Sequence, residues 1–366
     1  MGFELKQSAS LVVMDNIDNK KPKHKRRKRY KGTHPKTYAE KYKELEPEKY
    51  KETIEKIIQK GSTPAGMHRP IMVDEIMDFL EIKPGQVGLD ATLGYGGHTQ
   101  EILSRLDFKG HLYALDVDSV ELPKTHKRLE NLGYGSEILT TCLVNFSKID
   151  QVVEKSGPLN FMMADLGVSS MQIDNPQRGF SYKNDGPLDL RLNPEKGLSA
   201  AQRLRDLSQD ELAGLFIQNS DEPHAEIIAK AIFNARRSGM KITTTTELRD
   251  IITDALKFLP KETQESSIKK SCQRCFQALR IDVNGEFEAL YEFLAKLPDA
   301  LAPGGRVAIL SFHSGEDRMV KKAFQRYFRE GIFSEIAKSP ERPSGEETAS
   351  NSRARSAKLR WAIKTE

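Results

Sequence analysis

Apolar residues in the middle of the chain follow two alternating patterns. Four short apolar runs predict buried strands, at residues 87–90, 111–116, 137–143 and 159–165. Three stretches with apolar residues three or four positions apart predict helices, at 71–80, 98–106 and 119–131. Because strands that alternate with helices form parallel sheets covered on both faces, the pattern predicts an α/β fold with a Rossmann-like, doubly wound sheet.

The alternation stops after the fourth strand. Residues 173–198 are rich in Asp, Asn, Pro and Gly, and residues 199–272 have a polar, helical pattern. A fifth strand is predicted only at 306–311, after a helix end and a tight turn at 301–305. We therefore expect a helical insertion within the sheet domain. A cleft is expected at the junction, because ligands of open α/β sheets bind beyond the carboxyl ends of the strands.

Charge separates the N-terminal region from the rest of the chain. Residues 1–66 contain 17 Lys and Arg but only 9 Asp and Glu, whereas the whole chain has a net charge of +5. Nine of these basic residues lie within Lys20–Lys31. Such density repels itself, so we predict a disordered extension with one or two short amphipathic helices at 37–60. It is either a solvated tail or an arm that binds nucleic acid phosphates, through Lys25, Arg26, Arg27, Lys28 and Arg29.

These patterns divide the chain into three parts. Residues 1–66 are the basic extension, residues 67–172 and 273–366 the sheet domain, and residues 173–272 an inserted helical domain. No run approaches the about 18 apolar residues of a membrane span. Three cysteines do not make a disulfide framework, and the one C-x-x-C pair lacks the further ligands that zinc requires. We expect a cytoplasmic protein without a metal or a membrane anchor.

A glycine-rich loop follows the first predicted strand. Gly94, Gly96 and Gly97 let the backbone turn tightly between this strand and the next helix, as at the start of an α/β nucleotide site. Asp116 ends the second strand, where a carboxylate can accept both hydroxyls of an adenosine ribose. A dinucleotide prefers G-x-G-x-x-G, whereas this loop is G-x-G-G-H. S-adenosylmethionine (SAM), which has no phosphate, is the favoured cofactor, and a dinucleotide is the alternative.

Other candidate residues lie near later strand ends. Asp165 ends the fourth strand and aligns with Asp90 and Asp116, which favours a site residue facing the transferable group over a loop cap. A dense patch follows, with charges of both signs among aromatic residues: Arg178, Phe180, Tyr182, Lys183, Asp185, Asp189 and Arg191. It is either an RNA contact, in which aromatic rings stack on a base, or a turn with surface ion pairs. His313, after the fifth strand, is either a base or phosphate contact or a helix cap.

With these residues assembled, the chain resembles the MraW/RsmH family of SAM-dependent methyltransferases from His68 to Ile363. The resemblance rests on ordered motifs, namely Asp90–Gly94, Gly96–His98, Asp165–Ser170, Arg178–Ser181, Asp185–Asp189, Phe276–Ile281, Ala302–Arg306, Ser311–Ser314, Glu316–Arg318 and Arg353–Ser356. It implies a class I methyltransferase fold with an inserted substrate domain. The family methylates the N4 amine of the decoding-site cytosine in 16S ribosomal RNA. SAM is thus the implied cofactor and the small ribosomal subunit the implied partner, and a homodimer is compatible with the resemblance.

The resemblance also implies which residues form the site. By position, the cofactor contacts are Gly96, Gly97, His98, Asp116, Phe146, Asp165 and Gln172. We expect Asp165 to orient the cytosine amine, with Asp185 or Asp189 assisting, and we expect Arg178, Lys183 and Arg191 to contact RNA.

Three alternatives to this function differ in substrate or in chemistry. Met171 and Gly315 depart from the family pattern, which leaves open a paralogue that methylates another RNA cytosine. A non-catalytic rRNA-binding assembly factor would lack the cofactor acids, whereas Asp116 and Asp165 are both present. A DNA amino methyltransferase would carry a proline-rich loop after the fourth strand, where this chain has Asp165–Val168.

Overall fold

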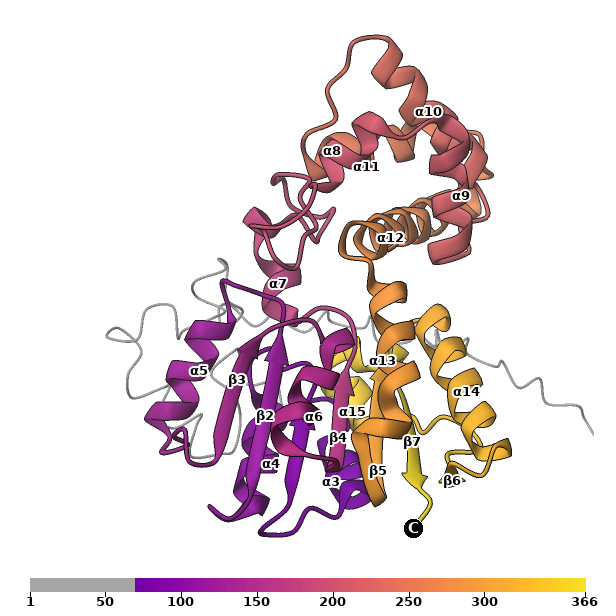
Figure 1. Ribbon diagram of the computed structural model, residues 1–366. Helices are drawn as coiled ribbons and strands as arrows, with labels where there is room; N and C mark the ends of the chain where they lie inside the picture. Colours follow the sequence, from indigo (N-terminus) through magenta and orange to yellow (C-terminus); the bar gives the residue numbers. More distant parts are fainter. Residues whose placement is uncertain (1–69) are drawn as a thin grey trace, which may run out of the picture. The chain divides into compact units, whose positions relative to one another are not determined.

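The computed structural model describes residues 70–366, whose strands form one seven-stranded sheet (Figure 1). The strands are β1 (Val87–Asp90), β2 (His111–Asp116), β3 (Leu139–Leu143), β4 (Leu159–Asp165), β5 (Leu301–Ser311), β6 (Phe333–Ile336) and β7 (Lys358–Lys364). Their order across the sheet is β3-β2-β1-β4-β5-β7-β6. The pairings from β3 to β5 are parallel, and β7 is antiparallel to both of its neighbours. The predicted parallel sheet is confirmed, and β1, β2 and β4 have the predicted bounds.

The fifth strand is longer than its apolar pattern indicates. Leu159 of β4 pairs with Leu301 and Phe161 with Arg306, with a register shift between the two pairs. Gly304, with a φ of +68°, allows the backbone to bend within this irregular start. The tight turn predicted at 301–305 lies inside β5: Leu301 and Arg306 pair with β4 residues only two positions apart, so residues 302–305 form the irregular part of the strand.

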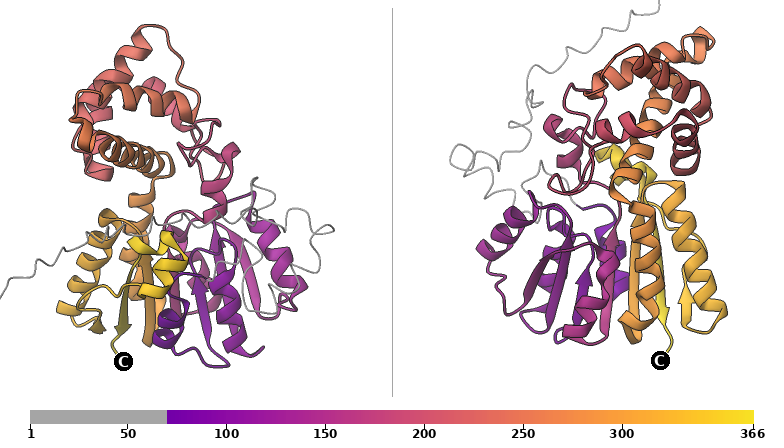
Figure 2. Two further views of the ribbon diagram at one scale, coloured as in Figure 1. Left: turned by 180° about the vertical axis from the view of Figure 1, so that it is seen from behind. Right: turned by 45° about the horizontal axis from the view of Figure 1, so that its top comes forward.

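Helices cover both faces of the sheet (Figures 1 and 2). One face packs against α3 (Val73–Leu80), α4 (Gly97–Leu106) and α5 (Leu122–Asn131). The other packs against α6 (Asp150–Ser156), α13 (Glu286–Ala300) and α14 (Ser314–Arg329). Successive side chains of β4 enter the two cores in turn, with Phe161 and Met163 in the first and Met162 and Ala164 in the second. This arrangement confirms the doubly wound sheet.

The segment between β4 and α13 is mostly helical, as its polar pattern predicts. Its helices are α8 (Ala200–Asp206), α9 (Gln209–Ser220), α10 (Ala225–Arg237), α11 (Thr245–Ala255) and α12 (Lys261–Asn284). They share a hydrophobic core of their own, which includes Leu204, Phe216, Ile232, Leu248 and Leu279. α12 is a single helix of 24 residues, so the domain boundary expected after residue 272 falls inside it. α12 therefore begins in the helical core, and its C-terminal end leads into α13, which packs on the sheet (Figure 1).

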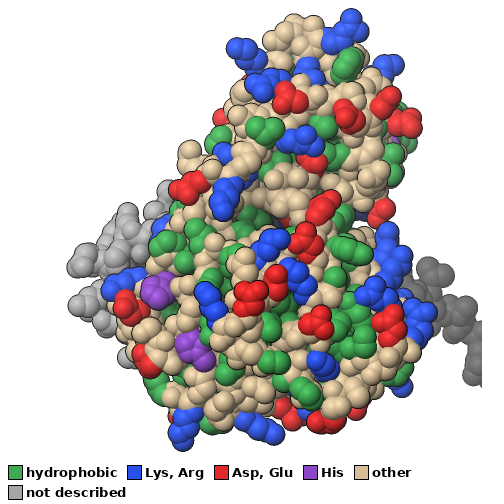
Figure 3. Space-filling model, in the orientation of Figure 1, with side chains coloured by type: hydrophobic (Ala, Val, Ile, Leu, Met, Phe, Trp, Pro, Cys, Tyr) green, Lys and Arg blue, Asp and Glu red, His purple; other side chains and the backbone are tan. Residues whose placement is uncertain are grey.

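Short elements complete the described residues. They are α7 (Ser170–Asp174) and α15 (Gly345–Ser350), together with the 3-10 turns Phe146–Lys148, Pro176–Arg178 and Ser352–Ser356. Among residues 70–366, no helix combines the length and the apolar character needed to cross a membrane. The face seen in Figure 3 mixes acidic and basic side chains. The basic residues 25–29 and the helices expected at 37–60 lie outside the described residues.

Candidate active site

The carboxyl ends of β1, β2 and β4 open onto a cleft of about 1140 Å³. The predicted cofactor contacts that line it are Gly97, His98, Asp116, Phe146, Asp165 and Gln172. Gly96 lies behind the surface of the cleft with a φ of +70°, and a Cβ atom there would lie 3.0 Å from the methyl group of Thr125. A side chain at Gly96 would therefore meet both backbone strain and a close contact.

The glycine loop is fixed by hydrogen bonds at Gly94. Its N–H donates to Oδ2 of Asp116 over 2.7 Å, and its carbonyl accepts from Oγ1 of Thr125, also over 2.7 Å. Oδ1 of Asp116 accepts from the N–H of Asp118 at 2.9 Å. Two backbone donors thus orient the Asp116 carboxylate, and each of its oxygens retains a lone pair for a further donor. Burial raises the pKa of Asp116 to about 6, so the group is ionised at neutral pH.

Asp165 lies at the end of β4, where its N–H donates to Oγ1 of Thr92 over 2.7 Å. Its side chain is 31% exposed, and the exposed part faces the cleft. Burial of the rest raises the pKa of Asp165 to about 8, and the negative charges of Asp90 and Glu316 add to the shift. The carboxyl group is therefore largely protonated at neutral pH, and a positive charge beside it would lower its pKa.

His98 does not supply that charge. Its Nε2 lies 3.0 Å from the carbonyl oxygen of Ile71, which can only accept, so this nitrogen carries the ring proton. Burial lowers the pKa of His98 to about 4, so the ring is neutral at physiological pH. Nδ1 lies 3.7 Å from Oδ2 of Asp165. The imidazole forms part of the wall beside Asp165 without compensating its charge.

Asp90, the third strand-end carboxylate, serves the loop instead of the cleft. It is 1% exposed and accepts hydrogen bonds from Oγ1 of Thr99 at 2.6 Å and from the N–H of Thr92 at 3.0 Å. Burial raises its pKa. It ties the end of β1 to the first turn of α4 and so holds the glycine loop in place.

Phe146 begins the 3-10 turn that follows β3. Its ring packs edge-on against Phe293 of α13, with centroids 5.3 Å apart, and it also lines the cleft. This packing leaves an aromatic surface for a flat, apolar group beside Asp116.

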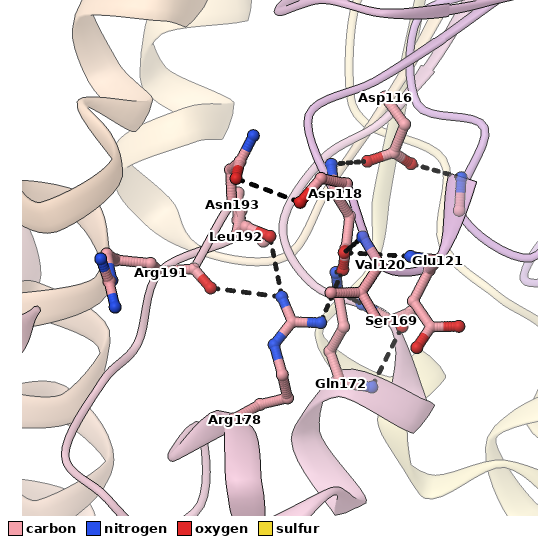
Figure 4. A network of polar contacts seen from close by, with 12 residues as sticks. Asp116, Asp118, Val120, Glu121, Ser169, Gln172, Arg178, Arg191, Leu192 and Asn193 are labelled. Carbon is pink, nitrogen blue, oxygen red and sulfur yellow. Dashed lines mark hydrogen bonds and ion pairs between the residues drawn. The ribbon is translucent and has the colours of Figure 1, made fainter. Parts of the chain in front are cut away.

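A polar network joins the end of β2 to the segment after β4 (Figure 4). Asp118 is 1% exposed, and its Oδ2 accepts from Nε2 of Gln172 at 2.6 Å and from Nη1 of Arg178 at 2.8 Å. The other end of the Arg178 guanidinium donates to the carbonyls of Arg191 and Leu192. The RNA contact expected at Arg178 is corrected here, because the side chain is buried and its donors are used within the protein.

The remaining residues of the predicted patch divide into those that line the cleft, among them Phe180 and Tyr182, and those that do not. Lys183 is exposed and lines the cleft, which leaves it free to meet a phosphate. Asp189 and Arg191 form a two-pronged ion pair, with nitrogen–oxygen distances of 2.8 and 2.7 Å. Asp185 is exposed and accepts a hydrogen bond from Thr246. Neither Asp185 nor Asp189 lines the cleft, so the structure does not bring them to the catalytic position expected for them.

Sequence reasoning missed a charged cluster opposite Asp165. Arg280 near the end of α12 donates from Nε and Nη2 to the two carboxylate oxygens of Glu286, both over 2.8 Å. Glu316 in the first turn of α14 is 4% exposed and lies 3.1 Å from Nε2 of His313. All four residues line the cleft. Arg280 and Glu316 lie in motifs that carry the resemblance, but only His313 was given a candidate role. Its backbone position is the N-cap of α14, in agreement with the helix-cap alternative.

The sheet order, with an antiparallel β7 between β5 and β6, and an acidic cleft at the strand ends define a class I methyltransferase fold. The chain belongs to the MraW methylase family, whose model matches residues 65–365. Ribosomal RNA small subunit methyltransferase H 2 of Alkaliphilus metalliredigens is 68% identical over 348 residues, which are 95% of this chain and 100% of that protein. Ribosomal RNA small subunit methyltransferase H 1 of Lachnoclostridium phytofermentans is 64% identical over 360 residues, which are 98% of each chain. The resemblance inferred from the motifs is confirmed.

Proposed function

We propose that this protein transfers the methyl group of SAM to the exocyclic N4 amine of a cytosine in 16S ribosomal RNA. The observation that carries the proposal is the placement of Asp116 and Asp165 at two strand ends of one cleft, beside a loop of glycines. The names of the two relatives support a ribosomal RNA of the small subunit as the substrate.

The residues of the cleft fit SAM better than a dinucleotide. Asp116, at the end of β2, is ionised at neutral pH, and a cationic ligand would favour ionisation of Asp165 at the end of β4, whereas a pyrophosphate would oppose it. Because Gly94 and Gly97 have no side chains, a cofactor can approach the backbone closely there, and Phe146 offers a surface for the adenine. When bound, SAM supplies a methyl group on a positively charged sulfur. Asp116 is ionised above about pH 6 and would accept hydrogen bonds from both ribose hydroxyls.

We assign to Asp165 the role of orienting the N4 amine of cytosine and accepting its proton. The N4 lone pair of cytosine is delocalised into the ring, so the nitrogen becomes nucleophilic only as it pyramidalises and its N–H bonds weaken. An ionised Asp165 accepts a hydrogen bond from N4–H and so aligns the nitrogen with the methyl group. As the N–C bond forms and the C–S bond breaks, the surplus N4 proton passes to the carboxylate. A pKa of about 8 before cofactor binding suits a proton acceptor near neutral pH.

The RNA itself is proposed to bind along the open side of the cleft. Lys183 is the exposed basic residue of the predicted patch that lines it. The basic residues 25–29 are proposed as a second, sequence-independent contact to phosphates.

The test is mass spectrometry of rRNA nucleosides and of nuclease fragments from a strain that lacks this gene. Wild-type protein should restore N4-methylcytidine at one position of 16S rRNA. Asp165→Asn should fail to restore it while still binding S-adenosylhomocysteine. Asp185→Asn, the same change outside the cleft, serves as the matched control and should restore N4-methylcytidine. A mark on another base, or restoration by Asp165→Asn to within about tenfold of wild type, contradicts the proposal.

A further inference from the structure

Arg280 presents a fixed pair of donors to the cleft. Glu286 holds its Nε and Nη2 through two hydrogen bonds of 2.8 Å, and the side chain is only 14% exposed. No acceptor among residues 70–366 binds Nη1, although Arg280 lines the cleft. The ion pair with Glu286 uses one edge of the guanidinium. The opposite edge, formed by Nη1 and the second hydrogen of Nη2, is left with two parallel donors.

This edge lies close to the loop that carries Asp165. A Cβ atom built on Gly167, two residues after Asp165, would be 4.0 Å from Nη2 of Arg280 and 4.0 Å from the ring of Phe312. The absence of a side chain at Gly167 therefore leaves the guanidinium and the β4 loop in near contact. Arg280 and Asp165 both line the cleft.

We infer that Arg280 is a specificity-determining residue that donates hydrogen bonds to N3 and O2 of the target base. The inference rests on the proposed function and names the group that would select cytosine. N3 and O2 of cytosine are adjacent acceptors, and N4 lies beside N3, so a base held on the Arg280 edge turns its amine toward Asp165. Uracil has an N–H at position 3, which would face the guanidinium donors and repel them. Adenine offers a single acceptor, N1, beside its amine. Reading a base by its Watson–Crick edge is usual for bases turned out of a strand.

The acidic residues around Arg280 fit this role better than a metal site. The ligand atoms of Glu286, His313 and Glu316 lie within 4.8 Å of one another, a spacing that would suit a cation. Both oxygens of Glu286, however, already accept from Arg280, and Oε2 of Glu316 accepts from the N–H of Phe312 at 2.9 Å. A metal ion there would lie beside a guanidinium of the same sign. Glu286 is therefore assigned to holding Arg280 in position.

The inference is tested with RNA that carries 3-deazacytidine at the target position, which keeps the N4 amine but replaces N3 by C–H. Methyl transfer from labelled SAM is compared for this RNA and for the cytidine RNA. Wild type should lose about tenfold or more in kcat/KM on the modified RNA, beyond the intrinsic change in amine reactivity. Arg280→Lys keeps the positive charge but loses the two parallel N–H donors of the guanidinium. It should be slower than wild type on cytidine RNA, and the ratio between its two substrates should shrink by about tenfold.

Lys270→Ala, which removes an exposed charge from the same helix outside the cleft, is the control and should retain the wild-type ratio. Affinity for S-adenosylhomocysteine and the thermal midpoint verify that each variant is folded. If Arg280→Lys does not fold, Arg280→Gln combined with Glu286→Gln removes both charges together and takes its place.

Three results decide between the inference and the proposed function. If wild type does not methylate cytidine RNA at the amine, both are wrong. If wild type is active but Arg280→Lys shows the same ratio between the two RNAs, only the role of Arg280 is wrong. If the variant loses affinity for S-adenosylhomocysteine to the same extent as activity, Arg280 serves the cofactor, and the inference is overturned.

Discussion

Asp165 owes its properties to the residues around it. Its carboxyl group shares the region with Asp90 and Glu316, and the neighbouring His98 is neutral, so no positive charge offsets the cost of burial. A carboxyl group in this state is prepared for a cationic ligand, since the ligand removes the penalty that raises the pKa. If SAM is the cofactor, as proposed, we expect the site to bind the sulfonium and the neutral thioether product with different pH dependence.

We predict that affinity for SAM increases with pH relative to affinity for S-adenosylhomocysteine. Below the pKa of about 8 for Asp165, binding of a cation must release a proton, so SAM binding strengthens as the pH rises and levels off above that value. The neutral thioether gains nothing from this ionisation, and the titration of Asp116 near pH 6 affects both ligands alike. Calorimetry at about pH 6.5 and pH 9 should show the affinity ratio change by about tenfold. In Asp165→Asn the ratio should not change; a ratio that is constant in wild type contradicts the assignment.

The acidic residues at strand ends could be found from the sequence, because the last residue of an apolar run marks where a buried strand ends. Asp116 and Asp165 each close an apolar run, and parallel strands end at one edge of the sheet, so their proximity followed from the pattern. Asp118 was missed because nothing local distinguishes it from other loop carboxylates. Its importance comes from Gln172 and Arg178, which lie more than 50 positions away in the sequence.

The segment after α7 is held against the sheet by a few buried polar contacts. Arg178 bridges Asp118, at the end of β2, to the carbonyls of Arg191 and Leu192. On the other side, the N–H of Leu192 donates to Oδ1 of Asn284, near the end of α12, at 2.7 Å. Leu192 also lines the cleft. This wall of the cleft thus depends on contacts with both the sheet and α12.

We predict that Arg178→Ala lowers the free energy of unfolding by about 3 to 5 kcal/mol, because it leaves the Asp118 carboxylate buried without its cation. Lys183→Ala, at an exposed position of the same patch, should change it by less than about 0.5 kcal/mol but should weaken RNA binding. Urea unfolding and fluorescence anisotropy with an rRNA fragment measure the two effects. Equal loss of stability in both variants, or unchanged RNA binding by Lys183→Ala, would contradict the structural role of Arg178 and the RNA-binding role of Lys183.

The N-terminal residues 1–66 and the rest of the chain have net charges of opposite sign. Residues 1–66 have an excess of eight basic residues, whereas the chain as a whole has a net charge of +5, so the remainder is slightly acidic. The face of that remainder seen in Figure 3 mixes both signs. Nonspecific attraction to RNA phosphates is therefore expected to depend on the N-terminal residues, whereas choice of the base belongs to the cleft.

We predict that replacing the nine Lys and Arg within Lys20–Lys31 by Gln in the full-length protein reduces the salt dependence of RNA binding. Each phosphate contact to a single strand contributes about −0.7 to the slope of log K against log salt, so the slope should fall by several units. Anisotropy titrations between about 50 and 200 mM salt measure it. Lys124→Gln with Lys127→Gln, on the exposed side of α5, serves as the control and should leave the slope unchanged. An equal slope for wild type and the Gln variant would make the cluster a passive tail.

The sequence by itself determined the alternation of strands and helices between residues 71 and 165, the glycine loop and the acids at the strand ends. Each of these is a local property, since the period of apolar residues states whether a segment is a strand or a helix and where it stops. The bounds of β1, β2 and β4 followed directly, whereas the irregular start of β5 did not, because Leu301 is held by pairing with Leu159 and not by its own pattern.

The tertiary structure alone decided which polar groups share the cleft. Arg280 comes from α12 and Glu316 from α14. Arg280 lines the same cleft as Glu316 and Asp165 because the long helix α12 returns from the inserted segment to the sheet. The same packing buried Arg178 and left Lys183 exposed, although the two residues are five positions apart in one basic patch. Apolar periodicity specifies the face of each element that is buried, but the meeting of polar side chains from distant elements depends on how those faces pack together.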